Sequence, residues 1–149
     1  MVSTPILEAA LVDNSRMSIG ALDLAADPRE FVVAVAGPAA LLVVKLHKFH
    51  DRIDTPDRLN DRDAHDVYRL LRAIETDVLS ESLSRLLCDP VGNAVTHQVL
   101  EYLDSDSARG ASARGSLMAG DTEGLVGDPV EVAESVSLLA RDLLDAVTS

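Results

Sequence analysis

The chain has 149 residues, a length that suits one domain built around one hydrophobic core. Hydrophobic residues make up 47% of it and charged residues 26%, which excludes an intrinsically disordered chain. The formal net charge of −12 argues against broad binding to nucleic acid, although it leaves room for one local basic patch. We therefore expect a single globular domain over residues 1–149.

The ends of the chain and its longest apolar run predict a cytoplasmic protein with no membrane segment. Residues 1–5 lack the basic and apolar regions of a signal peptide. The apolar run at 39–44 is too short to cross a bilayer. Cys88 is the one cysteine, so it forms no internal disulfide, and its leucine-rich context predicts a buried side chain.

The first third of the chain has the pattern of short β-strands. Residues 6–12 form an apolar run that ends in a polar turn at 13–15, and loose alternation follows at 17–22. Residues 31–35 are short and rich in valine, which is the strongest strand signal in the sequence. We predict a β unit of about three strands within residues 6–36.

Helical patterns dominate from Pro38 onward, and Pro38 is well placed in the first turn of a helix. A loop is expected at residues 53–60, and the Gly- and Ser-rich segment 104–128 is expected to be mostly loop, with some helix at 113–118. The predicted helices span residues 39–51, 61–75, 79–87, 94–103 and 130–147. The predicted fold is α+β, with a small N-terminal β unit followed by a helical bundle over residues 38–149.

Two cations lie on one line of the helix predicted at 39–51. Lys45 and Arg52 are seven residues apart, so about 20° separates them around the helix axis. They lie at the border of the apolar side of this helix, where a long side chain can rest on the core and present its charge in a cleft. Two surface cations with no further role remain the alternative interpretation.

The following helix carries carboxylates on its inner side. Asp63 lies within about 20° of the apolar Leu70, and Asp66 lies at the border of the buried face. A buried carboxylate is costly unless it is paired, so a lysine or arginine of the preceding helix is the expected partner. Asp61 is interpreted as the helix N-cap, and capping is the alternative for part of this acidic cluster.

The histidines do not have the spacing of a metal site. His47 and His50 are separated by about 300° in helical phase, and His65 belongs to another helix. We therefore expect them to be solvated or to support other side chains. Ser-His-Asp, Walker and glycine-rich phosphate motifs are absent from the sequence.

The run from Val35 to Lys48, the pair Asp51-Arg52 and the run from Asp61 to Leu71 resemble the minimal nucleotidyltransferase family, which includes the AbiEii-type toxins of toxin–antitoxin systems. The resemblance covers residues 6–75 clearly and corresponds to the C-terminal half of that fold. It implies that the predicted strands belong to part of a nucleotidyltransferase sheet. It also implies NTP as a ligand, an acceptor such as tRNA, and Mg²⁺ as the cofactor.

The resemblance also implies roles for single residues. Lys45 would contact the nucleotide triphosphate and offset developing charge, and Arg52 would bind phosphate or support the site. Asp63 best matches the acid that follows the family's lysine, and Asp66 is the second catalytic candidate. Asp13 would stand near an acid on the metal side of the site.

The chain departs from the family because it lacks the Gly-Ser turn followed by an Asp-x-Asp pair that holds Mg²⁺. We therefore expect a nucleotidyltransferase-like protein that is inactive alone or is completed by another chain. The alternative is a non-enzymatic helical module that binds a protein partner, or a second copy of itself, through an exposed sheet edge. An intact transferase with an unrecognised metal site is the third hypothesis.

Overall fold

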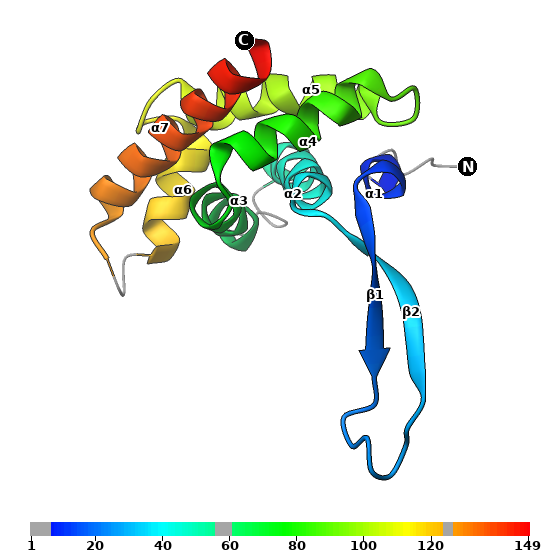
Figure 1. The fold of residues 1–149 in the computed structure, drawn as a ribbon. Coiled ribbons are helices and arrows are strands. Elements are labelled where there is room, and N and C mark those ends of the chain that lie inside the picture. Colours follow the sequence, from blue (N-terminus) through cyan, green and yellow to red (C-terminus); the bar gives the residue numbers. More distant parts are fainter. Residues whose placement is uncertain (1–6, 56–60, 124–126) are drawn as a thin grey trace.

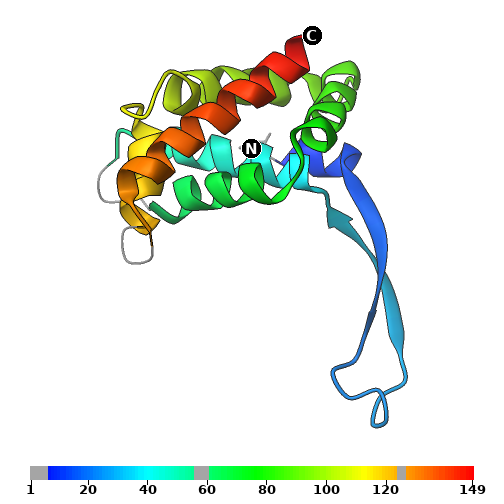
Figure 2. The same ribbon diagram turned by 60° about the vertical axis from the view of Figure 1, so that its left-hand side comes forward.

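A long β-hairpin projects from one end of a helical body in the computed structural model, which describes residues 7–55, 61–123 and 127–149 (Figures 1 and 2). Within these residues the fold is α+β and mostly helical. The elements in chain order are α1 (Glu8–Val12), β1 (Asn14–Gly20), β2 (Glu30–Ala36), α2 (Pro38–Arg52), α3 (Asp61–Ala73), α4 (Thr76–Cys88), α5 (Asn93–Leu103), the π-helical turn η3 (Asp104–Ala108), α6 (Arg114–Glu123) and α7 (Pro129–Thr148).

The body is a bundle in which α2 packs against α1, α3, α4 and α5, while α7 closes over α4 and α6. Its core is built from leucine, valine and alanine, as the scarcity of aromatic residues leads one to expect. The largest fully buried side chains include Leu42, Val43, Leu79, Leu83, Leu86, Val99, Leu103, Val136 and Leu143. Among the described residues, no helix is long and apolar enough to cross a membrane.

The hairpin is amphipathic, although it contacts little of the body. β1 and β2 pair antiparallel, from Asn14 opposite Ala36 to Gly20 opposite Glu30. Because side chains alternate between the faces of a strand, cross-strand partners share a face. The apolar face carries Met17, Ile19, Phe31, Val33 and Val35. The opposite face carries Arg16, Ser18, Glu30, Val32 and Ala34.

All of β1 and most of β2 are exposed to solvent. On the apolar face, the exposed fraction is 51% for Met17 and Ile19 and 60% for Phe31. An isolated two-stranded hairpin is only marginally stable in water, and large apolar patches on protein surfaces mark interaction sites. The apolar face of the hairpin is therefore a surface that the described residues leave uncovered.

The prediction of three strands is wrong, because residues 8–12 form helix α1 and only two strands are present among the described residues. Glu8, Ala9 and Leu11 favour helix over strand, and the apolar run that suggested a strand is too short to distinguish the two periodicities. Ala9 is completely buried in the bundle core, which holds the short helix in place. Residue 6, at the start of the predicted strand, lies outside the described residues.

The polar turn predicted at 13–15 overlaps β1, which begins at Asn14, and the strand predicted at 17–22 ends at Gly20. The other predicted elements agree with the structure, except between residues 104 and 128. The strand at 31–35 and the five predicted helices are present with small shifts at their ends. The predicted loop is largely replaced by η3 and by α6, which extends to Glu123. Gly115 and Gly120 suggested a loop, but they allow close packing: a Cβ at either position would overlap the carbonyl of Asp106 or of Pro129. Of the loop predicted at 53–60, residues 56–60 lie outside the described part.

The expected burial of Cys88 is wrong, since the free thiol is exposed. Cys88 is the last residue of α4, directly before Asp89 and Pro90. The leucines beside it are buried or partly buried, but the core ends two residues earlier, at the fully buried Leu86. Local hydrophobicity therefore overestimated how far the buried face of α4 extends.

Asp13 connects the hairpin to the start of α2. Its carboxylate Oδ2 accepts a hydrogen bond of 2.8 Å from the backbone N–H of Ala40, and its carbonyl accepts one of 2.9 Å from Gly37. The N-cap residue of α2 is Gly37, whose lack of a side chain leaves space for this carboxylate, since a Cβ there would overlap it. Asp13 thus satisfies an N–H donor that the helix cannot satisfy by itself.

Replacing Asp13 by alanine is expected to lower the free energy of unfolding by about 1 kcal/mol, the usual cost of losing a helix cap. Urea denaturation followed by circular dichroism measures this change. Asp27→Ala is the matched control, because Asp27 lies between β1 and β2, where its carboxylate is paired with Arg29 and has no hydrogen bond or ion pair with a helix among the described residues. Equal effects of the two substitutions would contradict the capping role.

Candidate functional site

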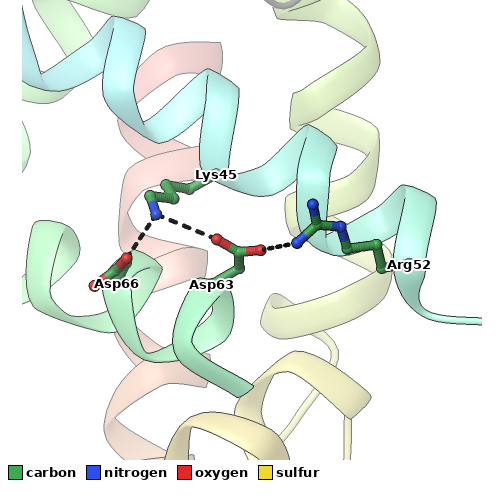
Figure 3. A network of polar contacts seen from close by, with 4 residues as sticks. All are labelled: Lys45, Arg52, Asp63 and Asp66. Carbon is green, nitrogen blue, oxygen red and sulfur yellow. Dashed lines mark hydrogen bonds and ion pairs between the residues drawn. The ribbon is translucent and has the colours of Figure 1, made fainter. Parts of the chain in front are cut away.

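Four charged side chains from α2 and α3 meet in one network, shown in Figure 3. Lys45 Nζ lies 2.7 Å from Asp66 Oδ2 and 3.2 Å from Asp63 Oδ1. Arg52 Nη1 lies 3.3 Å from Asp63 Oδ2. Asp63 therefore bridges the two cations, each of its oxygens accepting from one of them. The expected pairing of the inner carboxylates with cations of the preceding helix is confirmed.

Burial differs sharply within this network. The side chain of Asp63 is 7% exposed, whereas those of Lys45 and Asp66 are 28% and 35% exposed. The helical phases account for the difference, because Asp63 shares the inner face of α3 with Val67 and Leu71, while Asp66 lies at its edge. The network consequently has a buried end at Asp63 and an open end at Lys45 and Asp66.

The carboxylates of Asp66 and Asp63 raise the pKa of Lys45. The hydrogen bond to Asp66, followed by the interaction with Asp63, raises the pKa of the Lys45 ammonium, although partial burial opposes this shift. While both carboxylates are ionised, a raised pKa means that the pairing stabilises the fold below the ordinary value of 10.5, and this stabilisation is lost as pH rises through the folded pKa. Lys45 is therefore a fixed positive charge at neutral pH.

A cavity of about 310 Å³ adjoins the open end of the network. Its lining includes Lys45 and Asp66, together with Arg69 of α3. An ammonium group has three N–H donors, and two of those of Lys45 have carboxylate acceptors among the described residues. Lys45 can donate its third N–H to an anionic group in the cavity.

Asp13 is not part of this network. Its carboxylate and carbonyl accept from Ala40 and Gly37 at the N-terminus of α2, and its N–H donates to the carbonyl of Ala9. The structure thus brings together Lys45, Arg52, Asp63 and Asp66 and gives Asp13 a capping role. The metal role implied for Asp13 stays a prediction. The N-cap interpretation of Asp61 concerns a side chain outside those described.

The residues of the network do not fit a Mg²⁺ site. Mg²⁺ requires carboxylate or water oxygens in near-octahedral geometry, but both oxygens of Asp63 already accept from cations, and Lys45 is bound to Asp66. Among the described residues, no group of three or more His, Cys, Asp or Glu side chains could hold a metal ion. The described carboxylates are suited to holding Lys45 and Arg52 in place.

A second polar cluster, which the sequence did not predict, joins α2 to α5 and η3. The His50 ring stacks on Tyr102 with centroids 3.6 Å apart and an angle of 8° between the planes. His50 Nδ1 lies 2.9 Å from Oδ2 of the buried Asp106, and Ser105 donates to the other oxygen. His50 and Tyr102 also line a cavity of about 840 Å³.

Of the two roles expected for the histidines, solvated or supporting other side chains, His47 has the second, because it is only 8% exposed. Its ring packs edge-on against Tyr102, and its Nε2 lies 3.3 Å from Gln98 Oε1. The sequence holds no signal for this cluster, because His50 and Asp106 are 56 positions apart and lie on elements that only the bundle brings together.

Replacing Asp106 by alanine is expected to lower the free energy of unfolding by about 1–2 kcal/mol, because His50 and Ser105 lose their common acceptor. Chemical denaturation of both proteins measures the difference. Asp104→Ala is the matched control, since the ion pair of Asp104 with Arg109 is largely exposed. An unchanged stability of the Asp106 variant would show that this cluster does not hold η3 on α2.

Comparisons of the chain with protein-family models, with curated proteins and with solved structures find no match.

Proposed function

We propose that the chain supplies the lysine-and-carboxylate part of a nucleotidyltransferase-like active site, and that the metal-binding Asp-x-Asp part comes from polypeptide outside it. The network of Lys45 and Arg52 with Asp63 and Asp66 carries this proposal. Lys45 would contact the triphosphate of an NTP, and Arg52 would bind phosphate or brace Asp63. Asp66 would orient Lys45 toward the nucleotide.

The order of the elements supports the proposal. A hairpin with an uncovered apolar face leads directly into α2, and the cation Lys45 lies two turns into that helix. A sheet that continued into further strands would cover the hairpin and would bring its own side chains toward α2. The minimal nucleotidyltransferases, which the sequence resembles, have the same order of elements, with the Asp-x-Asp pair on strands that would precede the hairpin.

The chain by itself is proposed to be inactive. Mg²⁺ supplies charge neutralisation in nucleotide transfer, and the described carboxylates are already occupied by cations. Lys45, held by Asp63 and Asp66, can donate its third N–H to a triphosphate but cannot replace the metal. The completed protein would transfer a nucleotide from NTP to an acceptor such as tRNA, which is the activity expected of a relative of the AbiEii-type toxins.

The experiment begins with the DNA that precedes the Met1 codon and with the neighbouring reading frames. We expect one of them to encode a Gly-Ser turn followed by Asp-x-Asp. Co-expression with this chain should give a complex that transfers labelled nucleotide to tRNA in the presence of Mg²⁺. Lys45→Ala should reduce this transfer at least 100-fold, the scale of losing one preorganised charge contact.

Two results would contradict the proposal. One is the absence of an Asp-x-Asp segment from all neighbouring frames. The other is Mg²⁺-dependent transfer by the purified chain alone that is lost in Lys45→Ala. Lys48→Ala is the matched control, because Lys48 lies on the same helix and has no ion pair among the described residues.

The hairpin favours a second candidate, a non-enzymatic module that binds a protein through the hairpin's exposed sheet edges and apolar face. This candidate uses the same surface but assigns no chemistry to Lys45. A complex whose assembly and cellular effect do not change on Lys45→Ala would favour it over the transferase.

A further inference from the structure

The outer face of α3 is basic, in a chain whose net charge is −12. Each residue advances about 100° around a helix, so Arg62 and Arg69 lie within about 20° of each other, as do His65 and Arg72. The two rows are about 60° apart. All four side chains thus fall within an arc of about 80°, and we call this set, Arg62, His65, Arg69 and Arg72, the α3 basic face.

The α3 basic face is accessible to a ligand. Arg62, Arg69 and Arg72 are exposed, and His65 is partly exposed. The opposite side of α3 carries Ala64, Val67 and Leu71, which are buried in the bundle. The arginines therefore cannot turn inward to the core.

No carboxylate of the described residues forms an ion pair with the two arginines in the C-terminal half of this face. Within the described residues, Arg69 has no ion pair or hydrogen bond. Arg72 contacts Tyr68: its guanidinium lies 5.9 Å from the ring centroid, and Nη1 donates to the hydroxyl at 3.4 Å. The nearest acid along the helix, Asp66, is already bound to Lys45. Neither guanidinium group therefore has a carboxylate partner among the described residues, although Asp128 and Glu131 line a cavity together with Arg72.

The surface is hollowed on both sides of Arg69. One cavity, of about 350 Å³, is lined by His65, Tyr68, Arg69, Arg72 and Ala73. The other, of about 310 Å³, is the one that adjoins Lys45, and it shares Arg69 and Ala73 with the first. The small side chain of Ala73 leaves space between them. Arg69 consequently connects the α3 basic face to the charge network of Lys45.

We propose that the α3 basic face binds the phosphate groups of a substrate, with Arg69 and Arg72 as its main contacts. Guanidinium groups bind phosphate through paired N–H donors, and their planar shape suits this recognition. The arginines span about 15 Å along the helix, which corresponds to several successive phosphates of a nucleic-acid strand. The inference rests on the proposed function, for which it supplies an acceptor site next to Lys45.

The test uses the full chain, a fluorescently labelled 12-nucleotide RNA as a strand probe, and tripolyphosphate as a short probe. Fluorescence anisotropy measures RNA binding between 50 and 200 mM NaCl. Three arginine–phosphate contacts predict a slope of about −2 in a plot of log affinity against log salt, which is a loss of roughly 20-fold over this range. Arg69→Gln with Arg72→Gln should reduce the slope to about −0.7 and the loss to about threefold.

Arg114→Gln is the control, because Arg114 is exposed on α6 and its loss removes one positive charge away from the α3 basic face. It should leave the slope at about −2, and should leave tripolyphosphate binding, measured by calorimetry, unchanged. Tripolyphosphate binding that is lost in the Arg69/Arg72 variant without RNA binding would identify a free polyphosphate as the ligand.

The proposal is overturned if neither probe binds, or if both probes bind the Arg69/Arg72 variant and the Arg114 variant equally well. Circular dichroism and thermal melting verify that each variant is folded. The assay uses no metal and measures no transfer. Its failure is therefore distinct from failure of the proposed nucleotidyltransferase activity, which is tested on the completed complex.

Discussion

Replacing Lys45 and Arg52 together by alanine should lower the free energy of unfolding by about 3 kcal/mol, because Asp63 is then buried without a cation. Removing the partners of a buried charge costs about 3–5 kcal/mol. The lower end applies here, because both cations are partly exposed and water already screens part of their interaction. Urea unfolding followed by far-UV circular dichroism measures the change.

The decisive comparison is the triple variant, in which Asp63→Ala is added to the double variant. If the cost arises from an unpaired buried carboxylate, removing that carboxylate should restore about 1–2 kcal/mol. Lys48→Ala with Arg114→Ala is the control, since it removes one lysine and one arginine that have no carboxylate partner among the described residues. A triple variant that is less stable than the double variant would show that Asp63 stabilises the fold by another route.

Helical periodicity in the sequence is sufficient to predict most of the network that joins α2 to α3. Seven-residue spacing places Lys45 and Arg52 on one line of α2, and three-residue spacing places Asp63 and Asp66 near each other on α3. Consecutive helices joined by a short connection pack side by side, so the partners were limited to these two faces. The cost of burying Asp63 without a partner then made its pairing with the cations the expected outcome.

Contacts between elements far apart in the chain could not be predicted in this way. The capping of α2 by Asp13 joins residues 27 positions apart, and the sequence identified only a turn before β1. The contact of His50 with Asp106 depends on the π-helical turn η3, which has no recognisable sequence pattern. Periodicity describes one element at a time, whereas these contacts arise from the arrangement of the bundle.

Helix α1 shows a different limit of prediction from the sequence. Residues 8–12 are apolar and short, so tertiary packing decides between helix and strand. The burial of Ala9 against α2 selected the helix. The hairpin that follows was predicted as strands, but its exposure was not, because an alternating pattern identifies an apolar face without identifying what covers it.

The apolar face of the hairpin should cause the purified chain to self-associate at concentrations of tens of micromolar. Charged residues placed on this face should abolish the association. The variant combines Ile19→Lys with Phe31→Glu, two residues directly opposite each other in the hairpin. The new side chains can pair across the strands, so the hairpin should be retained while the apolar surface is interrupted. Sedimentation velocity over a concentration series measures the change.

The control introduces the same charges on the other face, by Ser18→Lys with Val32→Glu, the neighbouring cross-strand pair. Net charge, strand composition and position along the hairpin are then nearly identical in the two variants. Only the face differs, so association that persists in the control and is lost in the first variant must depend on Met17, Ile19, Phe31, Val33 and Val35. The melting temperature should stay nearly constant in both, because the replaced side chains are exposed and contact little of the bundle.

Wild-type chain that stays monomeric at about 100 µM would contradict the prediction that this face drives association by itself. Equal loss of association in both variants would attribute it to the open strand edges, since both variants alter edge chemistry to the same extent. Loss confined to the Ile19/Phe31 variant would place the contact on the apolar face. The same variant should then prevent assembly with the Asp-x-Asp polypeptide, because a completing sheet and a second copy would compete for one surface.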